Sequence, residues 1–236
     1  MSAGPASDEV AVIIPARNEA DRIQATVTAA LGLPAVAVVI VVDDGSKDGT
    51  AAAARSAGAV VARHARNRGK GAAMETGAAA VRLLDQREQR VRPRHLLFLD
   101  ADLGRTAAGA GPLTEPVLAG TADMTIAVFA TTVKLGGHGL VVGLSGAGIQ
   151  RATGWRPAQP LNGQRCLTRA AFEAARPLAR GWGVETALSI DLLRKGLRVT
   201  EVEVELAHRA TGTGMRAQLH RAHQLTGVAR ALATRL

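Results

Sequence analysis

Four apolar runs in the first hundred residues indicate the architecture of the chain. Each is short and almost continuously apolar, which is typical of a strand buried on both faces of a sheet. Segments with apolar residues at helical spacing lie between them, at 19–31, 48–57 and 72–84. The predicted strands are 10–14, 35–42, 59–62 and 95–99. Strands that alternate with helices predict an α/β fold with a mostly parallel sheet flanked by helices.

Polar clusters stand directly after the predicted strands. The first strand is followed by PARNE, the second by DDGS, the third by RNRGKG and the fourth by DADLG. The carboxyl ends of parallel strands meet at one edge of a sheet, where such sheets bind their ligands. We therefore expect the four clusters to converge on a single site.

Two acidic residues end the fourth predicted strand. Asp100 and Asp102 are one residue apart, so in an extended chain both project to the same side. A buried carboxylate is costly without a hydrogen-bond donor or a cation. The pair could ligate Mg²⁺ or Mn²⁺, with water and substrate phosphates completing the coordination shell. The residues alone leave a second interpretation open, in which the acids cap the next turn or pair with Arg105.

Composition narrows the class of protein. The 236 residues are 47% hydrophobic and 21% charged, which fits a globular chain with its own core. A net charge of +9 suits nucleotides, sugar phosphates or anionic membranes, but 2% aromatic residues and no Tyr argue against a nucleic-acid binder. The single cysteine, Cys166, is expected in the core and forms no internal disulfide. Neither a membrane-spanning run nor a signal peptide is recognisable, so a cytoplasmic protein is expected.

Five motifs resemble those of one enzyme family. The segments PARNEADRI, VVDDGSKDGT, GKGAAMETG and LFLDADLG are similar, in order and spacing, to family 2 glycosyltransferases with the GT-A fold. Residues 181–212 resemble the second half of bacterial glucosyl-3-phosphoglycerate synthases and of polyprenyl-phosphate sugar synthases. The resemblance implies one GT-A domain over 1–236. It comprises a nucleotide-sugar-binding half at 10–130, an acceptor half at 131–212 and a C-terminal amphipathic helix at 213–236.

The resemblance also implies contacts with a nucleoside diphosphate sugar. One of two aspartates would contact the base, with Ser46 nearby, and Lys70 would approach the ribose or the diphosphate. For the two aspartates and for Lys70, a plain role in a turn or a helix cap remains open. Positions along the nucleoside would be Pro15, Ala16, Arg17 and Glu19, and the aspartates at the base would be Asp43 or Asp44.

Metal and catalytic roles follow from the same resemblance. Asp102 would ligate Mg²⁺ or Mn²⁺ directly, Asp100 would face the ribose and the water shell of the metal, and His208 would be a further ligand. Glu185 occupies the acidic position near the acceptor and the sugar, where it could deprotonate or orient the acceptor hydroxyl. An acid in the first turn of a helix is also favoured by the helix dipole, so a structural role for Glu185 stays open.

The acceptor side carries weaker signals. The Gly-rich segment 134–165 lies where such enzymes place an acceptor loop, and its glycines suggest mobility. Arg151 and Arg165, with Arg156, could contact a phosphate or carboxylate of the acceptor. The C-terminal helix carries apolar residues at helical spacing, which predicts packing against the core of the protein, a dimer partner or an anionic membrane. Its apolar positions are Met215, Leu219, Ala222, Leu225, Ala229, Leu232 and Leu236.

The sequence thus predicts a metal-dependent glycosyltransferase. UDP is the expected nucleotide and glucose the sugar implied by the resemblance, with a small-molecule or lipid-phosphate acceptor and no nucleic acid. Peripheral membrane contact and a homodimer are left open. A polyprenyl-phosphate glycosyltransferase acting at a membrane surface is an alternative within the family. Two alternatives from other classes are a nucleotidyltransferase, which would carry a Gly-rich basic loop after the first strand, and a non-catalytic sensor of nucleotide sugars.

Overall fold

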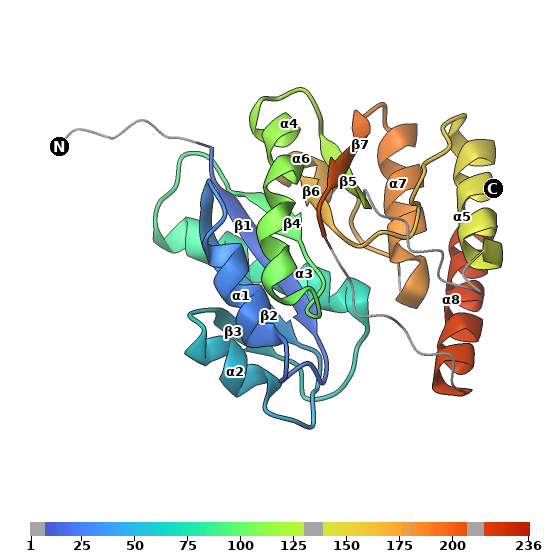
Figure 1. Cartoon of the computed structure of the whole chain (residues 1–236). Coiled ribbons are helices and arrows are strands. Elements are labelled where there is room, and N and C mark those ends of the chain that lie inside the picture. Colours follow the sequence, from blue (N-terminus) through green and yellow to red (C-terminus); the bar gives the residue numbers. More distant parts are fainter. Residues whose placement is uncertain (1–7, 130–138, 180, 207–214) are drawn as a thin grey trace.

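The chain folds around one seven-stranded sheet. The computed structural model describes residues 8–129, 139–179, 181–206 and 215–236. The strand order is β3-β2-β1-β4-β6-β5-β7, and β6 alone runs antiparallel to its neighbours (Figure 1). This confirms the predicted mostly parallel α/β sheet. The strands are β1 (Val10–Ala16), β2 (Val36–Asp43), β3 (Val60–Arg63), β4 (His95–Phe98), β5 (Met124–Phe129), β6 (Arg165–Leu167) and β7 (Val199–Val204).

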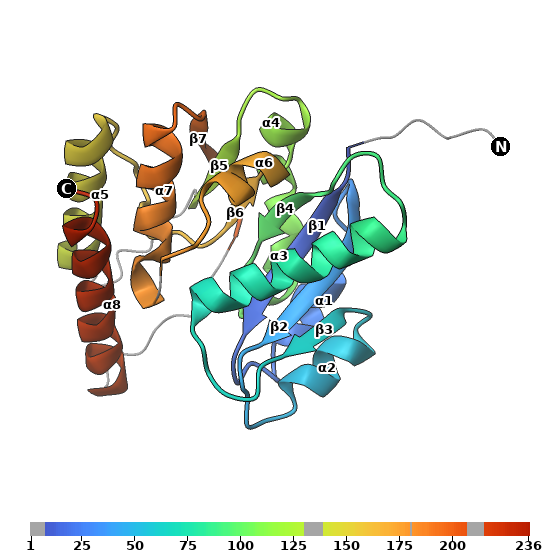
Figure 2. The ribbon, with the colours of Figure 1, turned by 180° about the vertical axis from the view of Figure 1, so that it is seen from behind.

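Helices cover both faces of the sheet. One face of β1 packs its Val10, Val12 and Ile14 against α1 and η1, and the other packs Ala11 and Ile13 against α3. Figure 2 shows α3 lying across the back of the sheet. The helical elements are α1 (Ile23–Leu31), α2 (Thr50–Ser56), α3 (Lys70–Arg87), η1 (Gly104–Leu113), α4 (Glu115–Leu118), α5 (Gly139–Thr153), α6 (Arg169–Ala174), η2 (Gly181–Gly183), α7 (Val184–Arg194) and α8 (Met215–Ala233).

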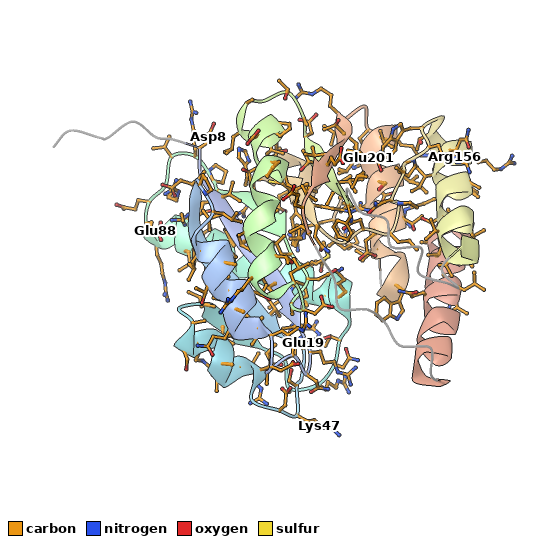
Figure 3. All side chains as sticks on the ribbon, in the orientation of Figure 1. Asp8, Glu19, Lys47, Glu88, Arg156 and Glu201 are labelled. Atoms are coloured by element: carbon orange, nitrogen blue, oxygen red, sulfur yellow. The ribbon has the colours of Figure 1, made fainter. Side chains whose placement is uncertain are left out.

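The order of the strands creates a topological switch point beside β1. The chain builds outward from β1 to β2 and β3, then returns to place β4 on the other side of β1. At such a switch point the loops after the two central strands diverge and leave room for a ligand. Figure 3 shows Glu19 and Lys47 at this carboxyl end of the sheet, and Asp8 and Glu88 at the opposite end.

Strand β1 runs two residues further than predicted. The sequence suggests that Pro15 ends it, but Pro15 and Ala16 pair with Val42 and Asp43 of β2. Proline lacks an N–H, which matters only where a neighbouring strand would accept from it. The ladder with β4 ends at the pair Ile13 and Phe98, so the missing donor leaves no acceptor of that strand unsatisfied.

Three helices begin at residues other than those predicted, and α2 begins at Thr50 rather than at 48. Helix α1 begins at Ile23 rather than at 19, because the chain turns at Asn18 with a φ of 56° before it enters the helix. Helix α3 begins at Lys70 rather than at 72, directly after Gly69, whose φ is 89°. Glycine adopts this left-handed conformation without strain. Lys70 therefore stands on the first turn of a helix and not in a loop.

Much of the Gly-rich segment is helical. Residues 139–153 form α5, which corrects the expectation of a mobile acceptor loop in this part of the segment. Glycines allow a close helix contact here, because a Cβ on Gly148 would lie 2.3 Å from Leu232 Cδ2 of α8. Helices α5, α7 and α8 share a small core that includes Ile149, Ile190 and Val228. Figures 1 and 2 show α5 and α8 side by side at the far end of the sheet.

In the part of α8 whose side chains the structure describes, the buried face differs from the predicted apolar stripe; the side chains of Met215, Leu219 and Ala222 lie outside that part. Leu232 is buried, but Leu225, Ala229 and Leu236 are exposed, and Val228 and Ala231 face the core instead. The helix thus packs on the protein's own core, which was one of the three predicted alternatives. The face that it buries is rotated about the helix axis relative to the predicted face. No helix among the described residues is long and apolar enough to cross a membrane. Cys166 is fully buried in β6, as expected.

Candidate active site

The loops after β1 and β2 are hydrogen-bonded to each other. The backbone N–H of Asn18 donates to Ser46 Oγ over 3.0 Å, and Asn18 Oδ1 accepts from the N–H of Lys47 over 2.9 Å. The N–H of Glu19 donates to Thr50 Oγ1 over 2.9 Å. The buried Ser46 therefore helps to hold the loop after β1 in place. The edge of the sheet predicted to lie along a nucleoside is fixed by these hydrogen bonds.

The predicted nucleoside positions line this edge. Pro15 and Ala16 close β1, with Ala16 buried, whereas Arg17 is exposed and Glu19 is partly buried. The edge thus carries two apolar residues, Pro15 and Ala16, followed by the charged residues Arg17 and Glu19.

Both carboxylate oxygens of Asp44 accept hydrogen bonds from the protein's own backbone. Its Oδ1 accepts from the N–H of Arg68, and its Oδ2 accepts from the N–H of Gly69, both over 2.8 Å. His64 Nδ1 lies 2.7 Å from the same Oδ1, and His64 Nε2 lies 2.9 Å from Thr76 Oγ1 on α3. Asp44 thus holds the loop between β3 and α3 in place.

Asp43 makes fewer contacts with the protein. Its Oδ1 accepts from the N–H of Ser46 over 2.8 Å, and its Oδ2 forms an ion pair with Arg63 Nε over 3.1 Å. The Arg63 side chain is 57% exposed, so this partner can turn away into solvent. Of the two aspartates left open by the sequence, Asp43 is the one whose second oxygen can exchange its partner.

Lys70 joins two carboxylates from distant parts of the chain. Its Nζ lies 2.7 Å from Asp100 Oδ1 at the end of β4, and 3.0 Å from Glu185 Oε1 in the first turn of α7. Gln164 Nε2 donates to Asp100 Oδ2 over 3.1 Å. The structure therefore brings together three residues that the sequence predicted from three separate motifs.

The two carboxylates, and not burial, decide the charge of Lys70. Burial alone would lower the pKa of Lys70, but the charges of Asp100 and Glu185 and the hydrogen bonds to them raise that pKa well above its usual value. Lys70 is accordingly a permanent cation at physiological pH. Because two carboxylates share one ammonium, the cluster keeps an excess of negative charge.

Asp102 stands on a turn that α1 holds in place. Arg22 Nη1 donates to the Asp102 carbonyl over 3.0 Å. Thr26 Oγ1 donates to the Ala101 carbonyl and accepts from the N–H of Gly104, both over 2.8 Å. The side chain of Asp102 is partly exposed. A fixed backbone therefore holds this partly exposed carboxylate in the loop after β4.

The donor set at this edge fits a hard divalent cation in an open site. Among the residues that the structure describes, no three His, Cys, Asp or Glu side chains form a closed metal cage. Asp100 and Asp102 offer carboxylate oxygens in a region of net negative charge, which is what Mg²⁺ and Mn²⁺ prefer. A cation held by so few protein ligands takes the rest of its shell from water and phosphate oxygens. His208, the third predicted ligand, lies outside the described residues.

The structure places two of the three arginines predicted to contact an acceptor in contrasting surroundings. Arg165 is buried, with 1% of its surface exposed, and its guanidinium donates to the carbonyls of Pro160, Asn162 and Glu185. Burial lowers its pKa to about 10. Arg165 thus ties α7 to the segment before β6, which does not fit contact with an acceptor. Arg151 is exposed in the last turn of α5, and no bond joins it to the described residues of the Lys70 cluster.

Sequence reasoning missed two residues of the cluster. Gln164 is fully buried beside Asp100, and Gly163 lies so close that a Cβ there would be 2.2 Å from Lys70 Nζ. They precede β6, a strand of three residues that carries too weak an apolar pattern to be recognised. Only the antiparallel pairing of β6 with β4 brings them to this edge.

Fold and site together define an α/β protein with an acidic, cation-fitting site at the switch point of its sheet. Residues 11–132 match the family described as glycosyl transferase family 2. The chain belongs to glycosyl transferase family 2, which confirms the predicted family.

One known relative matches more of the chain than residues 11–132. Glycosyltransferase AglJ of Haloferax volcanii is 28% identical over 213 residues, covering 89% of this chain and 66% of AglJ. The uncharacterized protein MJ1222 of Methanocaldococcus jannaschii is 34% identical over 119 residues, covering 50% of this chain and 46% of MJ1222. The chain thus spans less than two thirds of the length of either relative.

A solved structure shares the whole fold. Glucosyl-3-phosphoglycerate synthase from Mycobacterium tuberculosis, in complex with Mn²⁺, UDP and phosphoglyceric acid, matches with a TM-score of 0.77 at 25% identity. The match covers 98% of this chain and 79% of the mycobacterial one. The expected GT-A architecture is therefore confirmed.

Proposed function

We propose that this chain transfers a sugar from a nucleoside diphosphate sugar to a hydroxyl or phosphate acceptor, with Mg²⁺ or Mn²⁺ bound. The observation that carries the proposal is the Lys70 cluster, in which Lys70 meets Asp100 and Glu185 at the switch point of a family 2 chain. UDP is the preferred nucleotide and glucose the preferred sugar. The mycobacterial synthase, which was solved with UDP and Mn²⁺, supports this choice.

The binding roles follow from the positions of the side chains. The first loop, from Pro15 through Ala16 and Arg17 to Glu19, would flank the nucleoside. Asp43 would contact the base, because it can exchange Arg63 for a ligand, and Asp44 with Ser46 would keep the surrounding loops in shape. Asp102 would ligate the metal, Asp100 would face the ribose and the metal's water shell, and His208 is kept as a further ligand.

The chemistry needs stabilisation of a departing diphosphate. A bound Mg²⁺ or Mn²⁺ supplies a Lewis acid that neutralises charge growing on the leaving group. Lys70 adds a fixed positive charge beside that position, in a site largely shielded from water. Glu185, whose Oε1 lies 3.0 Å from Lys70 Nζ, would orient or deprotonate the acceptor hydroxyl.

Nucleotide binding by the folded protein tests the proposal. Thermal unfolding is measured with UDP and with GDP, each with Mn²⁺ and with EDTA, on wild type and on Asp102→Asn. A ligand at about 100 times its dissociation constant adds about 2.7 kcal/mol to the free energy of unfolding. We expect UDP with Mn²⁺ to raise the melting temperature of wild type, and Asp102→Asn to lose that shift. Asp8→Asn, the same change at the opposite end of the sheet, serves as the control (Figure 3).

Binding, together with a turnover assay on the wild type, separates the other classes. A wild type that neither nucleotide stabilises, with or without metal, contradicts the proposal. Slow release of UDP from a UDP-sugar without acceptor supports a transferase, whereas binding without turnover indicates a sensor. Release of pyrophosphate from a sugar 1-phosphate and a nucleoside triphosphate would instead indicate a nucleotidyltransferase.

A further inference from the structure

The segment before β6 reaches the acidic site from the second half of the chain. In the antiparallel pairing of β4 with β6, Phe98 stands opposite Arg165. Continuing this register places Gln164 opposite Leu99, and Gly163 opposite Asp100. The segment is held from its other side as well, because the N–H of Ala127 donates to the Gln164 carbonyl over 3.0 Å.

Gln164 controls one oxygen of Asp100. Its side chain is fully buried, and its Nε2 donates to Asp100 Oδ2 while Lys70 Nζ donates to Oδ1. Donors on both oxygens fix the rotation of the carboxylate. An amide does this without charge, whereas a lysine would neutralise Asp100 and a glutamate would repel it.

Gly163 controls the position of Lys70. A Cβ at this residue would lie 2.2 Å from Lys70 Nζ and 3.0 Å from Asp100 Oδ1, far inside van der Waals contact. Gly163 does not have the positive φ that would by itself favour glycine. The space next to the ammonium, and not the backbone conformation, therefore requires a residue without a side chain.

We propose that Gly163 and Gln164 are positioning residues of the donor site: Gln164 sets the orientation of Asp100, and Gly163 leaves the space in which Lys70 bridges Asp100 and Glu185. This inference rests on the proposed function and deepens it. The donor site is thereby completed by the second half of the chain, through residues that do not themselves ligate the metal. With both oxygens of Asp100 held by Lys70 and Gln164, a divalent cation at Asp102 would meet the Asp100 carboxylate in one orientation.

Gln164→Met tests the role of the amide. Methionine keeps the length of the side chain and removes the donor to Asp100. Binding of UDP is measured by calorimetry with Mn²⁺ and with EDTA, and the ratio of the two dissociation constants is compared with wild type. We expect the variant to lose about tenfold in affinity with Mn²⁺, the effect of one hydrogen bond to a charged group, and little with EDTA.

Gln159→Met is the matched control. Gln159 lies in the same segment, and its Oε1 accepts from Asn162 Nδ2 over 3.1 Å rather than contacting Asp100. A merely structural role would lower the melting temperature of both variants without changing the ratio of dissociation constants. Equal ratios in Gln164→Met, Gln159→Met and wild type overturn the inference. A wild type that binds UDP under neither condition overturns the proposed function, and the inference with it.

Gly163→Ala provides an independent variant that is expected to fold. The atom in its way is the end of a flexible lysine side chain, so the ammonium can move while the backbone stays in place. We expect the variant to unfold cooperatively, together with at least a tenfold slower release of UDP from a UDP-sugar and weaker Mn²⁺-dependent binding of UDP. Gly143→Ala is the control, because nothing lies within 4 Å of a Cβ there. Unchanged UDP binding and release in Gly163→Ala overturn the role of Gly163.

Discussion

At the scale of single residues, one ammonium organises the site. Lys70 reaches Asp100 and Glu185, residues 30 and 115 positions away along the chain, and its side chain is only 21% exposed. Without a compensating cation, two carboxylates so close together would repel each other in a poorly solvated place. Lys70 therefore stabilises the very arrangement that makes the site acidic.

Lys70→Met removes that compensation and keeps the unbranched side chain at most of its length. We expect a loss of about 2 kcal/mol in the free energy of unfolding, reduced from the value for a fully buried pair because water partly screens the cluster. The pKa of Lys70 is raised, so its contribution is fully present below the unfolded pKa of about 10.5 and is lost only as the pH rises through the folded pKa. Denaturant unfolding should thus give the same difference between wild type and variant at pH 7 and at pH 9. A difference that disappears between those two pH values would contradict this account.

At the scale of elements, the contact of α5 with α8 depends on a missing side chain. A Cβ on Gly148 would meet Leu232 Cδ2 at 2.3 Å and Leu232 Cγ at 3.0 Å. Leu232 is buried in the small core that α5, α7 and α8 share, so it has little room to give way. The same glycines that lower the intrinsic helix propensity of this segment thus permit the packing that makes it a helix.

Gly148→Ala should destabilise the protein through this contact. We expect a loss of about 1 to 2 kcal/mol, because overpacking costs more than the gain in helix propensity. Combining it with Leu232→Ala should cost less than the sum of the two single changes, since the truncated side chain leaves space for the new methyl group. Chemical denaturation of the four proteins measures this coupling. Strict additivity would show that the two helices do not meet as described.

At the scale of the whole molecule, the two halves of the chain share one sheet. Strand β6 comes from the second half and inserts between β4 and β5 of the first half. Strand β5 pairs with β6 and β7, both of which lie beyond residue 130. The half at 10–130, proposed to bind the nucleotide sugar, is therefore not closed by itself, and Gln164 and Glu185 reach the Lys70 cluster from outside that range.

A fragment of residues 1–130 tests this interdependence. It leaves β5 without a partner strand and exposes the edge of β4, so we expect no cooperative thermal unfolding and no stabilisation by UDP with Mn²⁺. Circular dichroism with a temperature ramp measures both properties, and the full chain is the control. A fragment that unfolds cooperatively and binds UDP would show that the first half is an independent domain.

The sequence by itself determined the first four strands, the intervening helices and the edge where their polar loops converge. These features are local, because apolar runs and the residues that follow them record which segments are buried and where they end. Lys70, Asp100 and Glu185 could be singled out for the same reason, since each stands in a recognisable motif.

Only the tertiary structure decided which of these residues contact one another and which further residues contact them. The pairing of a three-residue strand with β4 brought Gln164 and Gly163 to Asp100, and the packing of α8 turned a glycine-rich segment into a helix. It also buried Arg165, which the sequence had placed at an acceptor. Such contacts join residues far apart in the chain, and no local pattern of polarity records them, because they depend on strand order and on the space between side chains.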